Sequence, residues 1–196
     1  MSSHSLRRSR WRVTVFVSVL LVLVTADQAT KALAKRFLTP QSDISVIGHF
    51  IRLTLLHNSG ATMSIGATRT WVISLFAILA SVCVMWIGLK TQSLWWAITA
   101  GMTSAGALGN VIDRIVYAHG FIDGAVVDFI NYGPFVGNVA DIVLTIAAIA
   151  IVVGVLRAER FGITRIDRLL YSEDAEKSQH EKTEPGQRIE ENGRNK

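Results

Sequence analysis

Residues 138–156 read NVADIVLTIAAIAIVVGVL, an apolar run in which the only charged or amide side chains stand at the beginning. A helix needs about 20 residues to cross the hydrocarbon core of a bilayer, so this run predicts a transmembrane helix. Three earlier runs have the same character, at residues 11–30, 71–89 and 94–112. We therefore predict an all-α polytopic membrane protein with four transmembrane helices.

Charged residues divide the 196-residue chain into two parts. Through Arg157 the acidic residues are six aspartates, whereas residues 158–196 carry the other nine acids and eight of the 20 basic residues. We therefore predict a membrane domain over residues 1–157 and a charged cytoplasmic tail, largely disordered, over residues 158–196. The basic residues form no groove-like cluster with interleaved aromatics, so the net charge of +5 does not indicate a nucleic-acid partner.

The orientation follows from basic residues at the start of the first apolar run, namely Arg7, Arg8, Arg10 and Arg12. Such residues hold a helix end on the cytoplasmic side, and an even number of spans then places both termini there. Six basic residues fall on the outer side and weaken this bias: Lys31, Lys35, Arg36, Arg52, Arg69 and Arg114. The first run also resembles a cleavable signal peptide, but the three spans after it favour a retained helix.

The two outer connections differ in character. Residues 44–56 (ISVIGHFIRLTLL) are rich in β-branched residues and partly alternate, which predicts strands. We expect them to form a small extracytoplasmic β-rich cradle between the first two helices. The second connection, residues 115–137, contains several glycines and a proline, so we predict that it is rich in loops.

In this topology, several polar residues lie near the outer face. A charged side chain at membrane depth is costly, so such a residue is usually paired with another charge or has a function. Asp27 and Lys31 are four residues apart on one helix face, where they can form an ion pair or help to position a substrate. Asn110 and Asp113 close the third span, after small residues that let helices approach closely. We expect Asp113 to form a structural salt bridge with Arg114.

Asp128 and Asp141 differ from these aspartates because neither has a lysine or arginine within ten positions in the sequence. Asp128 lies within the apolar residues 126–130, and Asp141 begins the last span. Two carboxylates brought together in apolar surroundings share a proton, so one can act as general base and the other as general acid. Aspartic proteases apply this pairing to a water molecule and a peptide carbonyl. The alternative for Asp141 is a structural role as a helix N-cap.

Five short motifs resemble, in order, those of lipoprotein signal peptidases, also called signal peptidase II. They are residues 27–31 (DQATK), 58–61 (NSGA), 106–114 (GALGNVIDR), 126–129 (VVDF) and 138–141 (NVAD). With the four-span layout, the resemblance covers residues 11–157. Two positions depart from the family pattern, because Gly137 replaces a usual Phe and Thr62 a usual Ala. These departures concern the shape of the expected pocket more than its chemistry.

The resemblance implies that Asp128 and Asp141 are the catalytic pair. It implies that nine further residues bind substrate or support the pair: Asp27, Lys31, Asn58, Gly60, Asn110, Asp113, Arg114, Asn138 and Ala140. The implied activity is that of an aspartic endopeptidase of the bacterial cytoplasmic membrane. It would remove the signal peptide from diacylglyceryl-modified preprolipoproteins, just before the lipid-modified Cys, at a site near the extracytoplasmic face.

Other chemistries find less support in the sequence. The five histidines lack metal-ligand spacing, so we expect no metal and no cofactor. Cys83 lies in an apolar run, where a thiol stays inert. Two alternatives are a small carboxylate-based transporter, which predicts acids near mid-membrane and internal repeats, and a non-catalytic membrane scaffold. The expected partners are lipid-modified preprolipoproteins and membrane lipids, with the protein itself a monomer.

Overall fold

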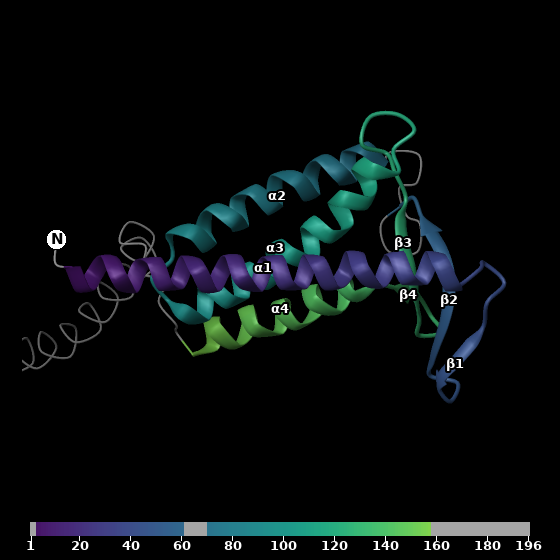
Figure 1. Ribbon diagram of the computed structural model, residues 1–196, viewed down its shortest axis with the longest axis horizontal. Coiled ribbons are helices and arrows are strands. Elements are labelled where there is room, and N and C mark those ends of the chain that lie inside the picture. Colours follow the sequence, from purple (N-terminus) through teal and green to yellow (C-terminus); the bar gives the residue numbers. More distant parts are fainter. Residues whose placement is uncertain (1–2, 61–69, 158–196) are drawn as a thin grey trace, which may run out of the picture.

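The computed structural model describes residues 3–60 and 70–157, with side chains from residue 10 onward. Within these ranges the chain forms four helices and one four-stranded antiparallel sheet. The helices lie side by side, and the sheet stands across one end of them (Figure 1). The predicted tail, residues 158–196, and Thr62 lie outside the described residues.

The four apolar runs all form helices, as predicted. They are α1 (Ser3–Phe37), α2 (Thr70–Lys90), α3 (Leu94–Val116) and α4 (Val139–Leu156). Helix α1 extends well beyond the predicted run at both ends, since its ends are polar but carry no helix-breaking residue. The connections place α1 and α3 in one direction and α2 and α4 in the other (Figure 1).

Among the described residues, three helical segments are long and apolar enough to cross a membrane: Arg10–Phe37, Thr70–Lys90 and Val139–Leu156. Helix α3 is not among them, so the prediction of four such spans is confirmed only in part. Its sequence is rich in glycine, alanine, serine and threonine, and it ends in Asn110, Asp113 and Arg114. A helix enclosed by other helices needs less apolar surface than one that faces lipid.

Helix α3 is enclosed in this way, because it packs against α1, α2 and α4. Its small residues allow close packing: a Cβ added at Gly106 would lie 2.6 Å from Cγ of Leu144 in α4, and one at Gly101 would lie 3.1 Å from the carbonyl oxygen of Phe16 in α1. The prediction that small residues bring these helices together is therefore confirmed. The outer faces of α2 and α4 instead expose large apolar side chains such as Phe76 and Ile149.

The sheet is built from both outer connections. The first supplies β1 (Ile44–Ile47) and β2 (Ile51–Asn58), which confirms the predicted strands. The second is rich in loops, as predicted, but it also supplies two short strands that were not predicted, β3 (Val126–Asn131) and β4 (Val136–Gly137). The strand order is β1-β2-β3-β4, and every neighbouring pair is antiparallel.

Strand β3 is the buried strand of this sheet. Its apolar residue Phe129 packs in a small core with Ala34 and Leu38 from the end of α1. Val127 is completely buried, and Asp128 between these two residues is also buried. The sheet therefore carries an acidic residue to the end of the helix bundle and holds it in a fixed position.

Candidate active site

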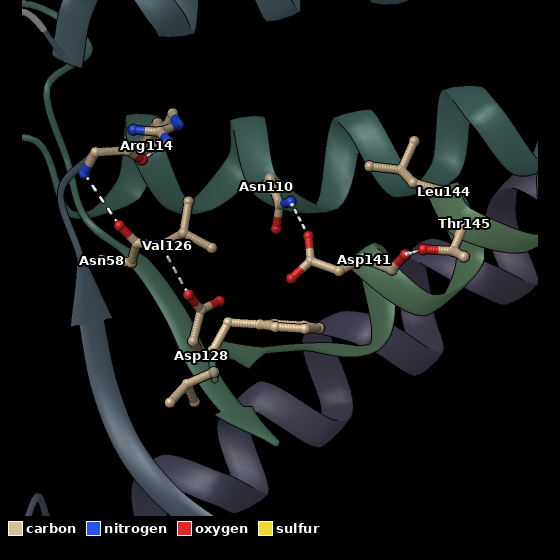
Figure 2. Close-up of a pocket in the computed structure, with 11 residues that line it drawn as sticks. Asn58, Asn110, Arg114, Val126, Asp128, Asp141, Leu144 and Thr145 are labelled. Atoms are coloured by element: carbon tan, nitrogen blue, oxygen red, sulfur yellow. Dashed lines mark hydrogen bonds between the residues drawn. The ribbon is translucent and has the colours of Figure 1, made fainter. Parts of the chain in front are cut away.

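Asp128 lies within β3, in the part of the strand that pairs with β2, whereas β4 pairs only with Ile130 and Asn131. The pairing of β2 with β3 sets Leu56 opposite Asp128 and Asn58 opposite Val126. Nδ2 of Asn58 donates a hydrogen bond to Oδ2 of Asp128 at 3.0 Å (Figure 2). Because only 2% of the Asp128 side chain is exposed, this bond and its neighbours determine the orientation of the carboxylate.

Asp141 lies in the first turn of α4, which begins with a capping box. Asn138 is the N-cap, and its side chain accepts a hydrogen bond from the backbone N–H of Asp141. In return, Oδ2 of Asp141 accepts the backbone N–H of Asn138 at 3.0 Å. The alternative prediction, an N-cap role for Asp141, is therefore right only in part. The N-cap residue is Asn138, and Asp141 contributes to the capping box through Oδ2. The other oxygen, Oδ1, accepts Nδ2 of Asn110 from α3 at 3.1 Å.

Two amides, the buried Asn138 and the half-buried Asn110, connect the two carboxylates. Nδ2 of Asn138 donates to Oδ1 of Asp128 at 2.7 Å and also to Oδ1 of Asn110 at 3.1 Å. Since Nδ2 of Asn110 donates to Asp141, the amides form a continuous hydrogen-bonded bridge between the acids. Each amide has its oxygen engaged as an acceptor, so its nitrogen is directed at a carboxylate.

Both carboxylates open into one pocket of about 510 Å³ (Figure 2). Its other lining residues come from β2, α3, β3, β4 and α4: Asn58, Gly60, Asn110, Arg114, Val126, Phe135, Val136, Leu144 and Thr145. No role was predicted from the sequence for five of these residues: Val126, Phe135, Val136, Leu144 and Thr145. Leu144 and Thr145 follow Asp141 by three and four residues on the same helix face, which was the signal available.

Arg114 lines the pocket from the end of α3 and contacts the segment after β2. Its Nη2 donates to the carbonyl oxygen of Gly60 at 2.7 Å. Its Nη1 is buried and has no hydrogen-bond partner among the described residues. The expected salt bridge between Asp113 and Arg114 was wrong, because Asp113 pairs with Lys31 at 2.8 Å. Asp113 and Arg114 are adjacent in sequence, but their side chains point in different directions from α3, so they do not pair.

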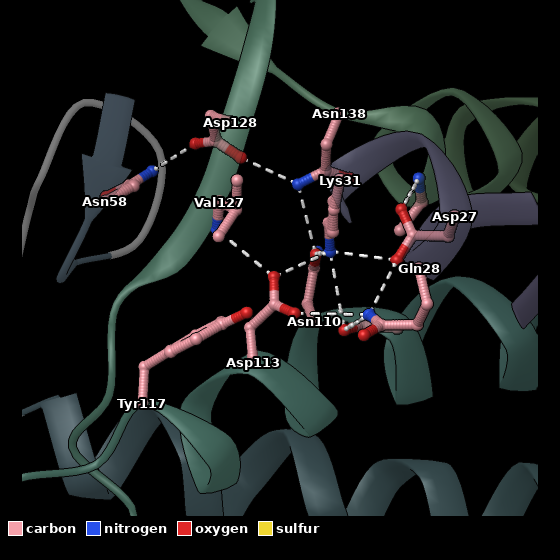
Figure 3. Close-up of polar contacts among 12 residues, drawn as sticks. Asp27, Gln28, Lys31, Asn58, Asn110, Asp113, Tyr117, Val127, Asp128 and Asn138 are labelled. Carbon is pink, nitrogen blue, oxygen red and sulfur yellow. Dashed lines mark hydrogen bonds and ion pairs between the residues drawn. The ribbon is translucent and has the colours of Figure 1, made fainter. Parts of the chain in front are cut away.

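Lys31 lies at the centre of a buried polar group beside the pocket (Figure 3). Its Nζ is 2.9 Å from Oδ2 of Asp27, which confirms the predicted i, i+4 ion pair, and it also contacts Asp113. Nζ donates to Oδ1 of Asn110 at 3.1 Å, which links this group to the amide bridge between the acids. Ala140 joins the same group through its backbone N–H, which donates to Oδ1 of Asp27 at 2.9 Å.

The pKa of Asp128 is raised from its usual 3.8 to about 6. Burial is the largest cause, and the neighbouring charge of Asp141 adds to it. The amide donors Asn58 and Asn138, together with the charge of Lys31, act in the opposite direction. A carboxyl group with this pKa can both hold and release a proton near neutral pH.

This raised pKa predicts a pH-dependent stability difference between the protein and its Asp128→Asn variant. Because the folded pKa exceeds the unfolded one, Asp128 stabilises the fold fully below pH 3.8, and that contribution is lost as the pH rises through 6. The full loss corresponds to about 3 kcal/mol. Asn cannot ionise, so the melting temperature of the variant minus that of the wild type should increase from pH 4 to pH 8. A constant difference across this range would contradict the assignment.

The described residues hold no group of three or more His, Cys, Asp or Glu side chains placed to bind a metal ion. Cys83 is exposed on α2 and does not line the pocket. Among the described residues, the polar groups that line the pocket are therefore two carboxylates, a guanidinium group, two side-chain amides and the hydroxyl of Thr145.

The family model described as signal peptidase (SPase) II matches residues 19–157, which include every element that lines the pocket. The chain belongs to the signal peptidase II family. It is therefore an aspartic peptidase with lipoprotein signal peptidase activity, and the transporter and scaffold alternatives are set aside.

Relatives and solved structures agree with this family membership. The chain is 45% identical to the lipoprotein signal peptidase of Bifidobacterium longum (strain NCC 2705) over 170 residues, which cover 85% of this chain and 93% of the relative. It is 40% identical to that of Mycobacterium tuberculosis (strain CDC 1551 / Oshkosh) over 143 residues, covering 72% and 71%. A solved bacterial membrane enzyme at 2.3 Å resolution is 28% identical, with a TM-score of 0.65, and the match covers 72% of this chain and 87% of that one.

Signal peptidase II is a multi-pass membrane enzyme of bacteria. In this chain, the residues predicted for its site form two groups. Four of the nine supporting residues line the pocket with the aspartates: Asn58, Gly60, Asn110 and Arg114. The other five lie behind the pocket and form hydrogen bonds or ion pairs with one another or with the aspartates: Asp27, Lys31, Asp113, Asn138 and Ala140.

Proposed function

We propose that this signal peptidase II cleaves diacylglyceryl-modified preprolipoproteins just before the lipid-modified Cys, with Asp128 and Asp141 as its catalytic aspartates. The observation that carries the proposal is the single pocket into which both carboxylates open, from β3 and from the start of α4. No other described acid lines that pocket.

The arrangement of donors around the two acids supports a shared role in hydrolysis. In the proposed reaction, one carboxylate takes a proton from a water molecule while the oxygen of that water attacks the scissile carbonyl carbon. The other carboxyl group donates its proton to the carbonyl oxygen, which gives a tetrahedral gem-diol. The C–N bond then breaks as the first carboxyl group passes its proton to the leaving nitrogen and the second carboxylate takes a proton from a gem-diol hydroxyl, which restores both aspartates. Asp128, the more deeply buried acid, has a pKa suited to such proton exchange.

Arg114 and the amides have a supporting part in this proposal. Arg114 lines the pocket that would receive the peptide, and its Nη1, which has no hydrogen-bond partner within residues 10–60 and 70–157, would donate to a carbonyl oxygen of the substrate. Asn58, Asn110 and Asn138 keep the carboxylates in place by their hydrogen bonds. Groups held in this way need no reorganisation when the substrate binds.

We further propose that α3 is a fourth transmembrane span and that the pocket lies at the extracytoplasmic face. The 23 residues of α3 extend about 34 Å, enough to cross a bilayer. The end of the bundle away from the sheet carries Arg10, Arg12, Lys90 and Arg157 and no described acid. The sheet end carries the six described aspartates together with five basic residues, Lys31, Lys35, Arg36, Arg52 and Arg114, so the net positive charge lies at the end away from the sheet (Figure 1). This asymmetry favours cytoplasmic termini.

The same proposal explains the depth of the site. A lipid anchor keeps its glycerol near the headgroups, so a scissile bond beside the modified Cys is presented at the membrane interface. Water reaches this depth, and binding of the acyl chains against the helices would orient the peptide bond. Because one chain supplies both aspartates and the whole pocket, a monomer is sufficient for the activity, and residues 1–157 form its membrane domain.

The dependence on lipid modification tests this proposal. We expect the purified enzyme to process a diacylglyceryl-modified preprolipoprotein at least about 100-fold faster than the unmodified precursor, since remote binding energy is used to orient the reacting bond. Mass spectrometry of the product should find the modified Cys at the new N-terminus. A precursor with Ser in place of that Cys serves as the control for background cleavage. Equal rates for both precursors, or cleavage at another bond, would contradict the proposal.

A further inference from the structure

Two buried aspartates outside the pocket hold the backbone next to each proposed catalytic residue. Oδ1 of Asp27 accepts the N–H of Ala140, the residue immediately before Asp141, at 2.9 Å. Oδ2 of Asp113 accepts the N–H of Val127, the residue immediately before Asp128, at 3.1 Å. The two contacts have the same form, although one involves the start of α4 and the other a strand of the sheet.

The spacing between Asp27 and Asp113 is set by two side chains of α1 (Figure 3). Nζ of Lys31 lies 2.9 Å from Asp27 and 2.8 Å from Asp113. Nε2 of Gln28 donates to Oδ2 of Asp27 at 3.2 Å and to Oδ1 of Asp113 at 3.1 Å. Gln28 also donates to the carbonyl oxygen of Gly109 in α3 at 3.0 Å. We call Asp27, Gln28, Lys31 and Asp113 the Lys31 cluster.

The Lys31 cluster has an excess of acidic groups, which the neutral amide of Gln28 compensates through hydrogen bonds. Asp27 and Asp113 are each 1% exposed and Lys31 is 2% exposed, so two buried negative charges face one positive charge. A buried charge is costly unless hydrogen bonds compensate it. The amide nitrogen of Gln28 supplies such donors to both acids at once, which holds them together despite their mutual repulsion.

The packing around Asp27 leaves little freedom for adjustment. A Cβ added at Gly109 would lie only 2.5 Å from Oδ2 of Asp27, so this carboxylate is seated directly against the backbone of α3. If a hydrogen-bond donor to Asp27 is lost, the carboxylate cannot adjust by moving toward α3. It moves instead relative to Ala140, whose backbone N–H it accepts, and so displaces the start of α4.

We propose that Gln28 is a positioning residue, which through the Lys31 cluster sets the distance between the carboxylates of Asp128 and Asp141. This inference rests on the proposed catalytic role of those two aspartates. Gln28 does not line the pocket and contacts neither Asp128 nor Asp141. Its effect on catalysis therefore passes through the backbone of Val127 and Ala140. Loss of Gln28 therefore lowers kcat and leaves KM unchanged.

The test compares two substitutions of Gln28 with a matched control. Gln28→Leu removes the donors, and we expect kcat about tenfold lower, because misplacement by a fraction of an ångström is costly in an active site. Gln28→Glu keeps the shape but adds a third negative charge, and we expect kcat about 100-fold lower. Gln92→Leu makes the same change in the exposed α2–α3 turn, where Gln92 accepts a bond from Arg12, and should leave kcat unchanged.

The readouts separate positioning from a general structural role. Assays run well below the melting temperature should find a reduced kcat with a wild-type KM, and hydrogen exchange should be faster at the amides of Val127 and Ala140 in Gln28→Leu. A wild-type kcat in Gln28→Leu, or a rise in KM alone, would overturn the inference. If Gln28→Glu does not fold, Gln28→Leu decides the question by itself.

The result is also distinguishable from failure of the proposed function. Activity retained by Asp128→Asn or Asp141→Asn would remove the catalytic assignment, whatever Gln28 does. Loss of activity in both of those variants, together with a wild-type kcat in Gln28→Leu, would remove the positioning inference alone.

Discussion

Replacing Asp128 or Asp141 by Asn lowers kcat by at least about 1,000-fold, because a catalytic acid or base that cannot exchange a proton leaves little of the chemistry intact. Asn has nearly the shape of Asp and keeps one acceptor oxygen for the neighbouring amides. Its NH2 group replaces the second acceptor oxygen and faces a donor, because both oxygens of each carboxylate accept hydrogen bonds. The loss of activity is therefore measured on variants whose melting temperature shows that they are folded. The two substitutions combined should cost little more than either one, since residues that act as a unit are not additive.

The measurement is the rate of precursor processing by equal amounts of folded enzyme, with melting temperature as the check on folding. Asp43→Asn is the matched control, because Asp43 lies outside the pocket and makes an exposed ion pair with Arg52 at 3.1 Å. Such a pair contributes about 1 kcal/mol or less, so this variant should process at the wild-type rate. Full processing by Asp128→Asn or by Asp141→Asn would refute the assignment.

Replacing Asn138 by Asp lowers both kcat, by about 100-fold or more, and the free energy of unfolding, by about 3 kcal/mol. Asn138 is completely buried and contacts both aspartates. Its Nδ2 lies 2.7 Å from Oδ1 of Asp128, and a carboxylate oxygen in that place would repel Asp128. The variant keeps the acceptor for the N–H of Asp141 but loses the donor that joins the two acids.

Asn131→Asp is the control for this substitution. Asn131 lies in the same connection, and its side chain acts as the acceptor for the N–H of Gly133 at 2.8 Å, a role that a carboxylate retains. We expect the control to process substrate at the wild-type rate and Asn138→Asp to lose both activity and thermal stability. If Asn138→Asp retains the wild-type kcat, the amide bridge between Asp128 and Asp141 has no part in catalysis.

The helices were predictable because their signal is local and continuous. Apolar runs of sufficient length have one stable conformation in a bilayer, so the four runs became α1 to α4, with small shifts at the ends of α2, α3 and α4 and a long extension of α1 at both ends. The polarity of α3 has a non-local cause, because its glycines and hydroxyl residues face three neighbouring helices. The sequence of residues 94–112 does not indicate how many other helices pack against α3.

Strand β3 was missed for a similar reason. Its apolar residues flank Asp128 without a clear alternation, and both faces are buried, so the period of two that marks a half-buried strand is absent. Its pairing with β2 joins segments separated by two helices. The glycines around it indicate turns, and in that context a short buried strand cannot be told from loop.

The candidate site shows the same division between local and non-local information. The i, i+4 pair of Asp27 and Lys31 was predicted correctly, because helix geometry alone determines it. The partner of Asp113 was not, since Lys31 reaches it from a different helix. Gln28 lay within a quoted motif but received no role, because its contacts with Asp113 and Gly109 exist only when α1 packs on α3.

The central claim is that Asp128 and Asp141 act together on one water molecule at the scissile bond. The most direct test is a structure of this enzyme bound to a peptide inhibitor that carries a secondary hydroxyl in place of the scissile amide. We predict that the hydroxyl oxygen lies within about 3 Å of a carboxylate oxygen of both aspartates. A hydroxyl bound away from the pocket, or in contact with only one aspartate while the other is turned elsewhere, would contradict the account.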